Sequence, residues 1–109
     1  MKLVVAILHH RDRQRLSEAL VQAEYKFTIL DSVGGFLREA GATFLLVVEE
    51  DSIPGLLALI ETHARQREQV VNFMPVEAAA AGALITSPIK APVGGAIVFT
   101  LDVDQFHRF

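Results

Sequence analysis

Apolar and polar positions follow one another along the chain in blocks that predict strands and helices in turn. Residues 3–8 form a continuous apolar run, typical of a strand that is covered on both faces. Residues 11–24 carry apolar side chains at helical spacing and predict an amphipathic helix. Residues 25–30 alternate and predict a strand with one polar-leaning face, and residues 43–48 predict another buried strand.

A second helix is expected after this strand. Asp51 or Ser52 can cap its first turn, and Pro54 fits inside that turn. The helix is expected to end within residues 65–68. Its apolar stripe consists of Ile53, Leu56, Leu57, Ile60 and Ala64.

Residues 69–92 interrupt the regular pattern. They contain several prolines and the low-complexity stretch EAAAAGA, which together predict a large irregular loop rather than a helix. The β-branched and aromatic run at residues 96–101 predicts the last strand.

The order βαββαβ predicts an α+β protein with a ferredoxin-like fold, in a single domain of residues 1–109. Hydrophobic residues make up 51% of the chain, which is a large share for a domain of this length. In this fold the helices cover only one face of the sheet. We therefore expect further subunits to cover the open face.

Composition disfavours several classes of partner. The formal net charge is -3, so the chain lacks the basic field with which proteins bind nucleic acid. It contains no cysteine, which excludes disulfides and thiolate metal sites. No apolar run is long enough to cross a membrane, and residues 3–8 do not resemble a signal sequence. We expect a cytoplasmic protein.

Candidate catalytic residues and metal ligands are few. His9 and His10 are adjacent, so on an extended chain they point to opposite sides and chelate one metal poorly. His63 is expected on the solvated face of its helix, and residues 49–51 are typical of a solvated helix start. The sequence predicts no catalytic residue, no metal site and no cofactor.

The stretch SVGGFLR, which follows the second strand, is the best candidate for a binding site. Gly34 and Gly35 can adopt positive φ and expose backbone N–H groups to an anion. Lys26 and Arg38 flank the glycines, and Thr28 can donate its hydroxyl. These residues favour a ligand that carries phosphate.

Phe36 and Leu37 come directly after the glycines. They offer an apolar surface on which a nucleotide base can stack beside the cationic residues. The alternative is that Phe36 packs on the core or on a neighbouring subunit.

Several motifs together resemble the cyclic di-AMP receptors of the PII-like superfamily. They are the opening KLVVAI, GGFLR at residues 34–38, Thr43-Phe44-Leu45, VGGAIVF at residues 93–99 and the terminal QFHRF. The likeness extends from end to end of the chain, and the combination of these motifs is specific.

This resemblance implies a homotrimer of ferredoxin-like subunits. It implies a glycine-containing loop between the second and third strands and a large loop before the last strand. The nucleotide ligand, cyclic di-AMP, is expected in clefts between subunits, where it reorders loops for a protein output partner of unknown identity. The resemblance thus implies a signal-transduction receptor and not an enzyme.

Site residues carry over from the family unevenly. The positions that match the family around the ligand are Thr28, Gly35, Phe36, Leu37 and Phe99. Four others depart, because the family usually has Arg at Lys26, Asn at Gly41, Gly at Val47 and Gln at Arg108. Lys lacks the forked donor of Arg, Gly cannot read a base edge, and Val adds bulk. We expect weaker or altered recognition of cyclic di-AMP.

Two alternatives stay open. The chain could form a PII-like trimer that binds a different small anion or nucleotide, or that has lost cyclic di-AMP binding. It could also be a small ferredoxin-like dimeric enzyme, although such an enzyme needs a polar catalytic group facing an apolar cavity. No His or carboxylate falls in the middle of a predicted strand, which disfavours the enzyme.

Overall fold

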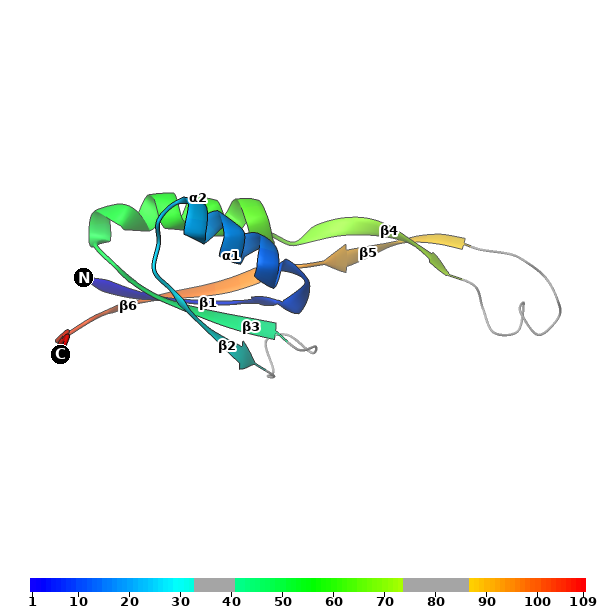
Figure 1. Cartoon of the computed structure of the whole chain (residues 1–109). Coiled ribbons are helices and arrows are strands. Elements are labelled where there is room, and N and C mark those ends of the chain that lie inside the picture. Colours follow the sequence, from blue (N-terminus) through cyan, green and yellow to red (C-terminus); the bar gives the residue numbers. More distant parts are fainter. Residues whose placement is uncertain (33–40, 74–86) are drawn as a thin grey trace.

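The computed structural model describes residues 1–32, 41–73 and 87–109. The helices and strands of this part of the chain are labelled in Figure 1. They are β1 (Lys2–His9), α1 (Arg13–Gln22), β2 (Thr28–Ser32), β3 (Gly41–Val48), α2 (Ile53–Ala64), β4 (Arg67–Phe73), β5 (Ser87–Val93) and β6 (Ala96–Asp102). Short 3-10 turns, His10–Asp12 and Glu50–Ser52, lead into the two helices.

The main sheet is antiparallel and has the strand order β2-β3-β1-β6. Both helices lie on the same face of this sheet (Figure 1). The units β1–α1–β2 and β3–α2–β6 thus interlock as two split βαβ units. The ferredoxin-like α+β fold predicted from the sequence is confirmed.

Side chains of the main sheet alternate between the core and an open face. Val4, Ala6 and Leu8 of β1 are fully buried beneath the helices. Leu3, Val5 and Ile7 alternate with them and are only partly buried on the other face. The continuous apolar run of β1 therefore combines one packed face with one apolar face that a single chain leaves partly open.

The core lies between the sheet and the helices. Phe44 of β3 is fully buried, and its ring stacks on Phe27 with the ring centroids 5.6 Å apart. The helix residues buried in this core are Leu16, Leu20, Leu56, Ile60 and Ala64. Leu57, which belongs to the predicted stripe of α2, is 38% exposed.

The chain leaves α1 through a Schellman motif. The N–H of Glu24 donates to the carbonyl of Val21 at 3.0 Å, and that of Tyr25 donates to Leu20 at 2.9 Å. Glu24 has φ 64, a left-handed conformation that is uncommon for a residue other than glycine. This motif ends the helix before the predicted boundary, and the 3-10 turn delays its start to Arg13.

The predicted side-chain cap of α2 is wrong. Ser52 forms no side-chain cap hydrogen bond and has φ -84 and ψ -13, whereas a capping residue is normally extended. The chain enters the helix from a 3-10 turn instead, with the N–H of Ser52 donating to Glu49 at 3.0 Å. Pro54 lies in the first turn as predicted, and α2 ends at Ala64, just before the expected range.

β4 and β5 form a two-stranded antiparallel ribbon, paired from Arg67 with Val93 to Phe73 with Ser87. The expectation of an irregular loop over residues 69–92 is therefore wrong for these strands. In the sequence, Pro88 and Pro92 disfavour strands. A two-stranded ribbon nevertheless tolerates these prolines, because each of its strands has a free edge. The ribbon projects from the end of the main sheet opposite to the termini (Figure 1). The rest of the predicted loop, residues 74–86, lies outside the described residues.

Candidate functional site

The open face of the main sheet is apolar. Leu30, Val47, Phe99 and Leu101 project from it and are between 42% and 50% exposed. Within the described part of the chain, no helix or strand covers this face (Figure 1). Contiguous apolar surface of this kind on a small protein marks an interaction site.

Predicted ligand residues lie in one row across this face. Thr28 of β2 pairs with Leu45 of β3, Leu45 pairs with Val5 of β1, and Val5 pairs with Phe99 of β6. Because paired residues point to the same face of a sheet, the side chains of Thr28 and Phe99 share the open face. The next row toward the N-terminus of β1 contains Val47, Leu3 and Leu101.

Thr28 and Phe99 nevertheless lie on opposite edges of the main sheet. β2 and β6 are its outermost strands, so three strand spacings separate the two residues, about 14 Å. A single chain therefore presents the predicted ligand residues as two separate groups. One group lies on the β2 edge and the other on the β6 edge.

The other predicted residues extend these two groups. Lys26 is exposed just before β2, and Gly41 is the first residue of β3, where it pairs with Ser32 and His9. Arg108 belongs to the exposed C-terminal segment that follows β6. The five predicted residues Gly34, Gly35, Phe36, Leu37 and Arg38 lie outside the described residues.

Each edge strand has a hollow beside it on the helix side of the sheet. A groove of about 430 Å³ lies between α2 and β6, and the residues that line it include the apolar Leu57, Ile60 and Val98 and the polar or charged Glu61, Arg65 and Gln66. A second hollow lies beside β2 and is lined by His10, Arg11, Arg13, Gln14, Ser17 and Ile29. The groove beside β6 thus combines apolar with charged residues, and the hollow beside β2 contains two arginines.

The histidines show no grouping that would hold a metal. His63 is half buried in the last turn of α2 rather than solvated, and its Nδ1 lies 2.8 Å from the carbonyl oxygen of Leu59. Among the residues that the structure describes, no three His, Asp or Glu side chains are arranged to bind a metal ion.

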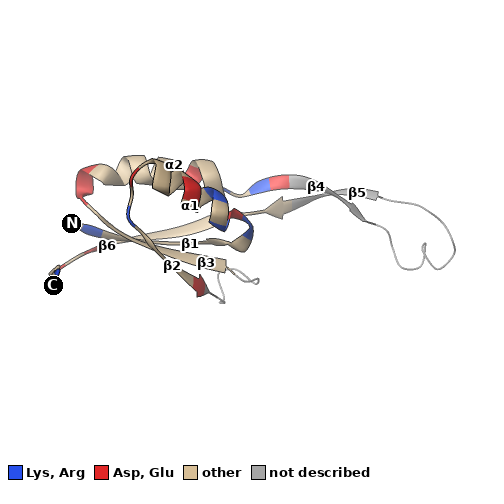
Figure 2. Cartoon of the chain, viewed as in Figure 1, with Lys and Arg blue, Asp and Glu red and all other residues tan. Residues whose placement is uncertain are grey.

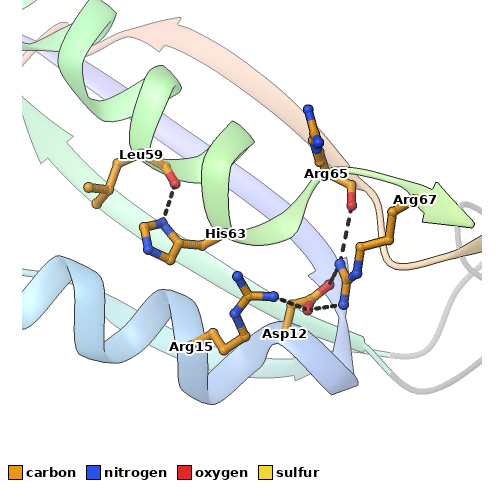
Figure 3. A network of polar contacts seen from close by, with 6 residues as sticks. All are labelled: Asp12, Arg15, Leu59, His63, Arg65 and Arg67. Atoms are coloured by element: carbon orange, nitrogen blue, oxygen red, sulfur yellow. Dashed lines mark hydrogen bonds and ion pairs between the residues drawn. The ribbon is translucent and has the colours of Figure 1, made fainter. Parts of the chain in front are cut away.

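A buried ion pair at the root of the ribbon was not predicted from the sequence. Asp12 is fully buried, and its carboxylate accepts hydrogen bonds from Nη1 and Nη2 of Arg67 at 3.1 and 2.9 Å (Figure 3). These hydrogen bonds raise the pKa of the Arg67 guanidinium above its already high value. Basic residues gather where α1 and β4 begin (Figure 2). In the sequence, the run HRDRQR was the only indication of an ion pair at Asp12, and it does not show which cationic side chain pairs with this carboxylate.

Comparison with solved structures first defines the fold. The PII protein of Arabidopsis thaliana, solved with citrate bound, matches with a TM-score of 0.61 at 20% identity. That match covers 94% of this chain and 73% of the PII chain. Together with the strand order and the ribbon before the last strand, it shows a PII-like fold.

Sequence comparison then gives the family. The chain belongs to the cyclic-di-AMP receptor family, whose match covers residues 1–109. A functionally unknown protein from Pediococcus pentosaceus ATCC 25745 is also similar, with 36% identity and a TM-score of 0.79 over 99% of this chain and 96% of that chain. Among the described residues, no helix is long and apolar enough to span a membrane.

Proposed function

We propose that this protein is a homotrimeric signal-transduction receptor that binds cyclic di-AMP in clefts between its subunits. The observation that carries this proposal is the position of Thr28 and Phe99 on one face but on opposite edges of the main sheet. Two such edge groups form one site only when the β2 edge of one subunit meets the β6 edge of the next.

A ring of subunits satisfies this geometry. An interface between two different edges is heterologous. Repeating it gives a closed ring when the rotation from one subunit to the next is a whole fraction of a full turn. A closed ring of three also turns the open faces of the sheets toward a common centre. Burial of Leu3, Val5 and Leu101 there removes apolar surface from water, which stabilises the assembly.

The residues of the two groups have complementary chemistry. Lys26 and Thr28 supply a cation and a hydroxyl, both suited to a phosphate oxygen. Phe99 is 42% exposed and supplies an aromatic face for a base, with Arg108 in the segment that follows. We include Gly34, Gly35, Phe36, Leu37 and Arg38 in the site because they match the family motif. A dinucleotide with two bases and two phosphates would use both edge groups at once.

The departures at Lys26, Gly41, Val47 and Arg108 favour binding weaker than that of a member with the usual residues. Val47 is 42% exposed on the open face, so its side chain occupies volume that a glycine would leave free. The second candidate function is therefore a PII-like trimer that binds another nucleotide or small anion. Both candidates describe a receptor for a protein output partner rather than an enzyme.

Calorimetry with cyclic di-AMP, ATP, ADP and AMP separates the two candidates. We expect cyclic di-AMP to bind more tightly than the mononucleotides. Thr28→Val, which removes the hydroxyl but keeps the shape, should weaken binding, whereas the matched change Thr62→Val on α2 should not. Tighter binding of a mononucleotide would favour the second candidate.

Mixing two defective variants tests the position of the site between subunits. Thr28→Val is defective on the β2 edge and Phe99→Ala on the β6 edge. A mixed trimer of the two contains one interface in which both edges are intact, so co-expression should restore part of the binding. If mixed trimers, isolated with two different affinity tags, bind no better than either variant alone, Thr28 and Phe99 do not form a site across subunits. If light scattering shows a monomer, no cleft between subunits exists and the proposal is wrong.

A further inference from the structure

Asp12 is the only charged side chain that is buried among those that the structure describes. It accepts both hydrogen bonds of the Arg67 fork, whose side chain is 32% exposed. Arg67 is the first residue of β4, so this planar pair fixes both the position and the direction of the chain where the ribbon begins.

Gly94, which directly follows the other strand of the ribbon, lies close to the same pair. It has φ 75, and a Cβ built on it would lie 2.6 Å from Nη1 of Arg67 and 2.8 Å from Oδ2 of Asp12. Nη1 of Arg67 also donates to the carbonyl of Arg65 at 3.2 Å. Both strands of the ribbon therefore leave the main sheet in direct contact with one buried ion pair.

The segment that carries Asp12 also contacts both strands that flank the proposed ligand site. His9 pairs with Gly41, where β3 begins. Nη1 of Arg13 lies 3.5 Å from Oδ1 of Asp31 in β2. These two contacts connect β3 and β2 with the residues on either side of Asp12, outside the core.

Arg15 provides Asp12 with a second possible partner. Its Nη1 lies 4.0 Å from Oδ1 of Asp12, and its side chain is 54% exposed (Figure 3). A buried carboxylate without a cation is strongly unfavourable, so an ion pair of this kind normally resists separation. With Arg15 in place, Asp12 can exchange Arg67 for Arg15 and stay paired. Asp12 thus has two arginines within reach, and a choice between two partners is what a two-state coupling element requires.

We propose that Asp12, Arg67 and Arg15 form a switch that couples ligand binding at β2 and β3 to the position of the β4–β5 ribbon. In one arrangement Arg67 holds the ribbon, and in the other Arg15 replaces it and the ribbon is released. The ribbon is then the arm that presents the state of the site to a partner. The coupling to a ligand rests on the proposed receptor function. The attachment of the ribbon by the Asp12–Arg67 pair is independent of that function.

Hydrogen exchange of the ribbon amides tests the attachment without ligand. Arg67→Gln should raise the exchange rates at the ribbon end nearest the main sheet at least about tenfold. The matched control Arg65→Gln removes a neighbouring charge and keeps the Arg65 carbonyl, so its rates should equal those of the wild type. Equal rates in Arg67→Gln and Arg65→Gln would overturn the proposal. If Arg67→Gln does not fold, Asp12→Asn with Arg67→Gln removes the buried charge as well and takes its place.

Gly94→Ala tests the same contact by steric means. It should displace the Arg67 fork and raise the same exchange rates, whereas Gly55→Ala should not, because a Cβ there meets only the Tyr25 hydroxyl at 3.7 Å. Unchanged ribbon exchange in Gly94→Ala would also contradict the proposal.

The coupling is tested by repeating the exchange experiment with cyclic di-AMP. Binding should change the ribbon exchange in the wild type and leave it unchanged in Arg67→Gln and in Arg15→Gln. If cyclic di-AMP binds by calorimetry but alters the ribbon equally in all of them, the switch is wrong and the receptor function stands. If no nucleotide binds, the receptor function fails, and the ligand-free comparison still decides whether the ion pair holds the ribbon.

Discussion

Lys2 and Asp102 lie opposite one another in the pairing of β1 with β6, and their side chains form an ion pair at the end of the main sheet. The hydrogen bond from Lys2 lowers the pKa of Asp102 below its ordinary value of 3.8, and the pair raises the pKa of Lys2 above 10.5. The pair therefore contributes fully to stability from about pH 3.8, the ordinary pKa of Asp102, to about pH 10.5, the ordinary pKa of Lys2. Its contribution is lost as the pH falls through the lowered pKa of Asp102 or rises through the raised pKa of Lys2.

The prediction from this pair is a change in the titration of Asp102. In Lys2→Met, the pKa of Asp102 should rise toward its ordinary value, because the hydrogen bond and most of the positive charge are gone. Carbon NMR of the Asp102 carboxyl in both proteins measures the two midpoints. Identical midpoints would show that the ion pair does not persist in solution.

Phe44→Ala should destabilise the fold strongly. Phe44 is fully buried and stacks on Phe27, so its truncation leaves a cavity at the centre of the core, which costs about 3–5 kcal/mol. Urea unfolding followed by circular dichroism measures the loss. Val21→Ala is the control, because Val21 is 63% exposed and its truncation should change stability by less than about 0.5 kcal/mol.

Glu24→Gly should stabilise the protein, which is unusual for a change to glycine. Glu24 has φ 64, and glycine adopts this conformation without strain. The gain is partly offset by the greater freedom of glycine in the unfolded chain, so we expect a net of about 0.5–1 kcal/mol. Glu18→Gly, in the middle of α1, should instead lose about 1 kcal/mol. Thermal unfolding of the two variants should therefore shift in opposite directions.

Restoring the usual family residues should strengthen the binding of cyclic di-AMP. Lys26→Arg, Gly41→Asn and Val47→Gly together should tighten it at least tenfold, about 1.4 kcal/mol, by supplying a forked donor, an amide and free volume. Calorimetry on the triple variant and the wild type measures the difference. If affinity is unchanged and Phe36→Ala also has no effect, the ligand lies elsewhere.

Much of the fold could be predicted because its signals are local. The apolar run of β1 and the stripe of α2 each identify an element from a few neighbouring residues. Pro88 and Pro92 misled the prediction, since local sequence does not show whether a strand has a free edge. Glu24 was missed for a related reason, because its left-handed conformation is imposed by the helix end rather than by its own preference.

The candidate site depends on strand register, which sequence spacing does not reveal. Thr28 and Phe99 could both be named from motifs, but their positions on opposite edges follow from pairings through Leu45 and Val5. Asp12 and Arg67 are likewise far apart in the sequence and meet only because the ribbon starts beside α1. Contacts of this kind require the three-dimensional arrangement.

The two prolines of β5 also limit how copies of the chain can aggregate. Pro88 and Pro92 both lie in β5, where they pair with Asn72 and Glu68. Proline has no N–H to donate, so within a strand its nitrogen is expected to face a free edge, here the side away from β4. A foreign strand that approached this outer side would find two of the donors that it needs missing, and the ladder of hydrogen bonds could not extend. Strand addition is thereby disfavoured along β5 of the projecting arm, and backbone pairing between copies is left to the outer edge of β4 and to the edges of the main sheet.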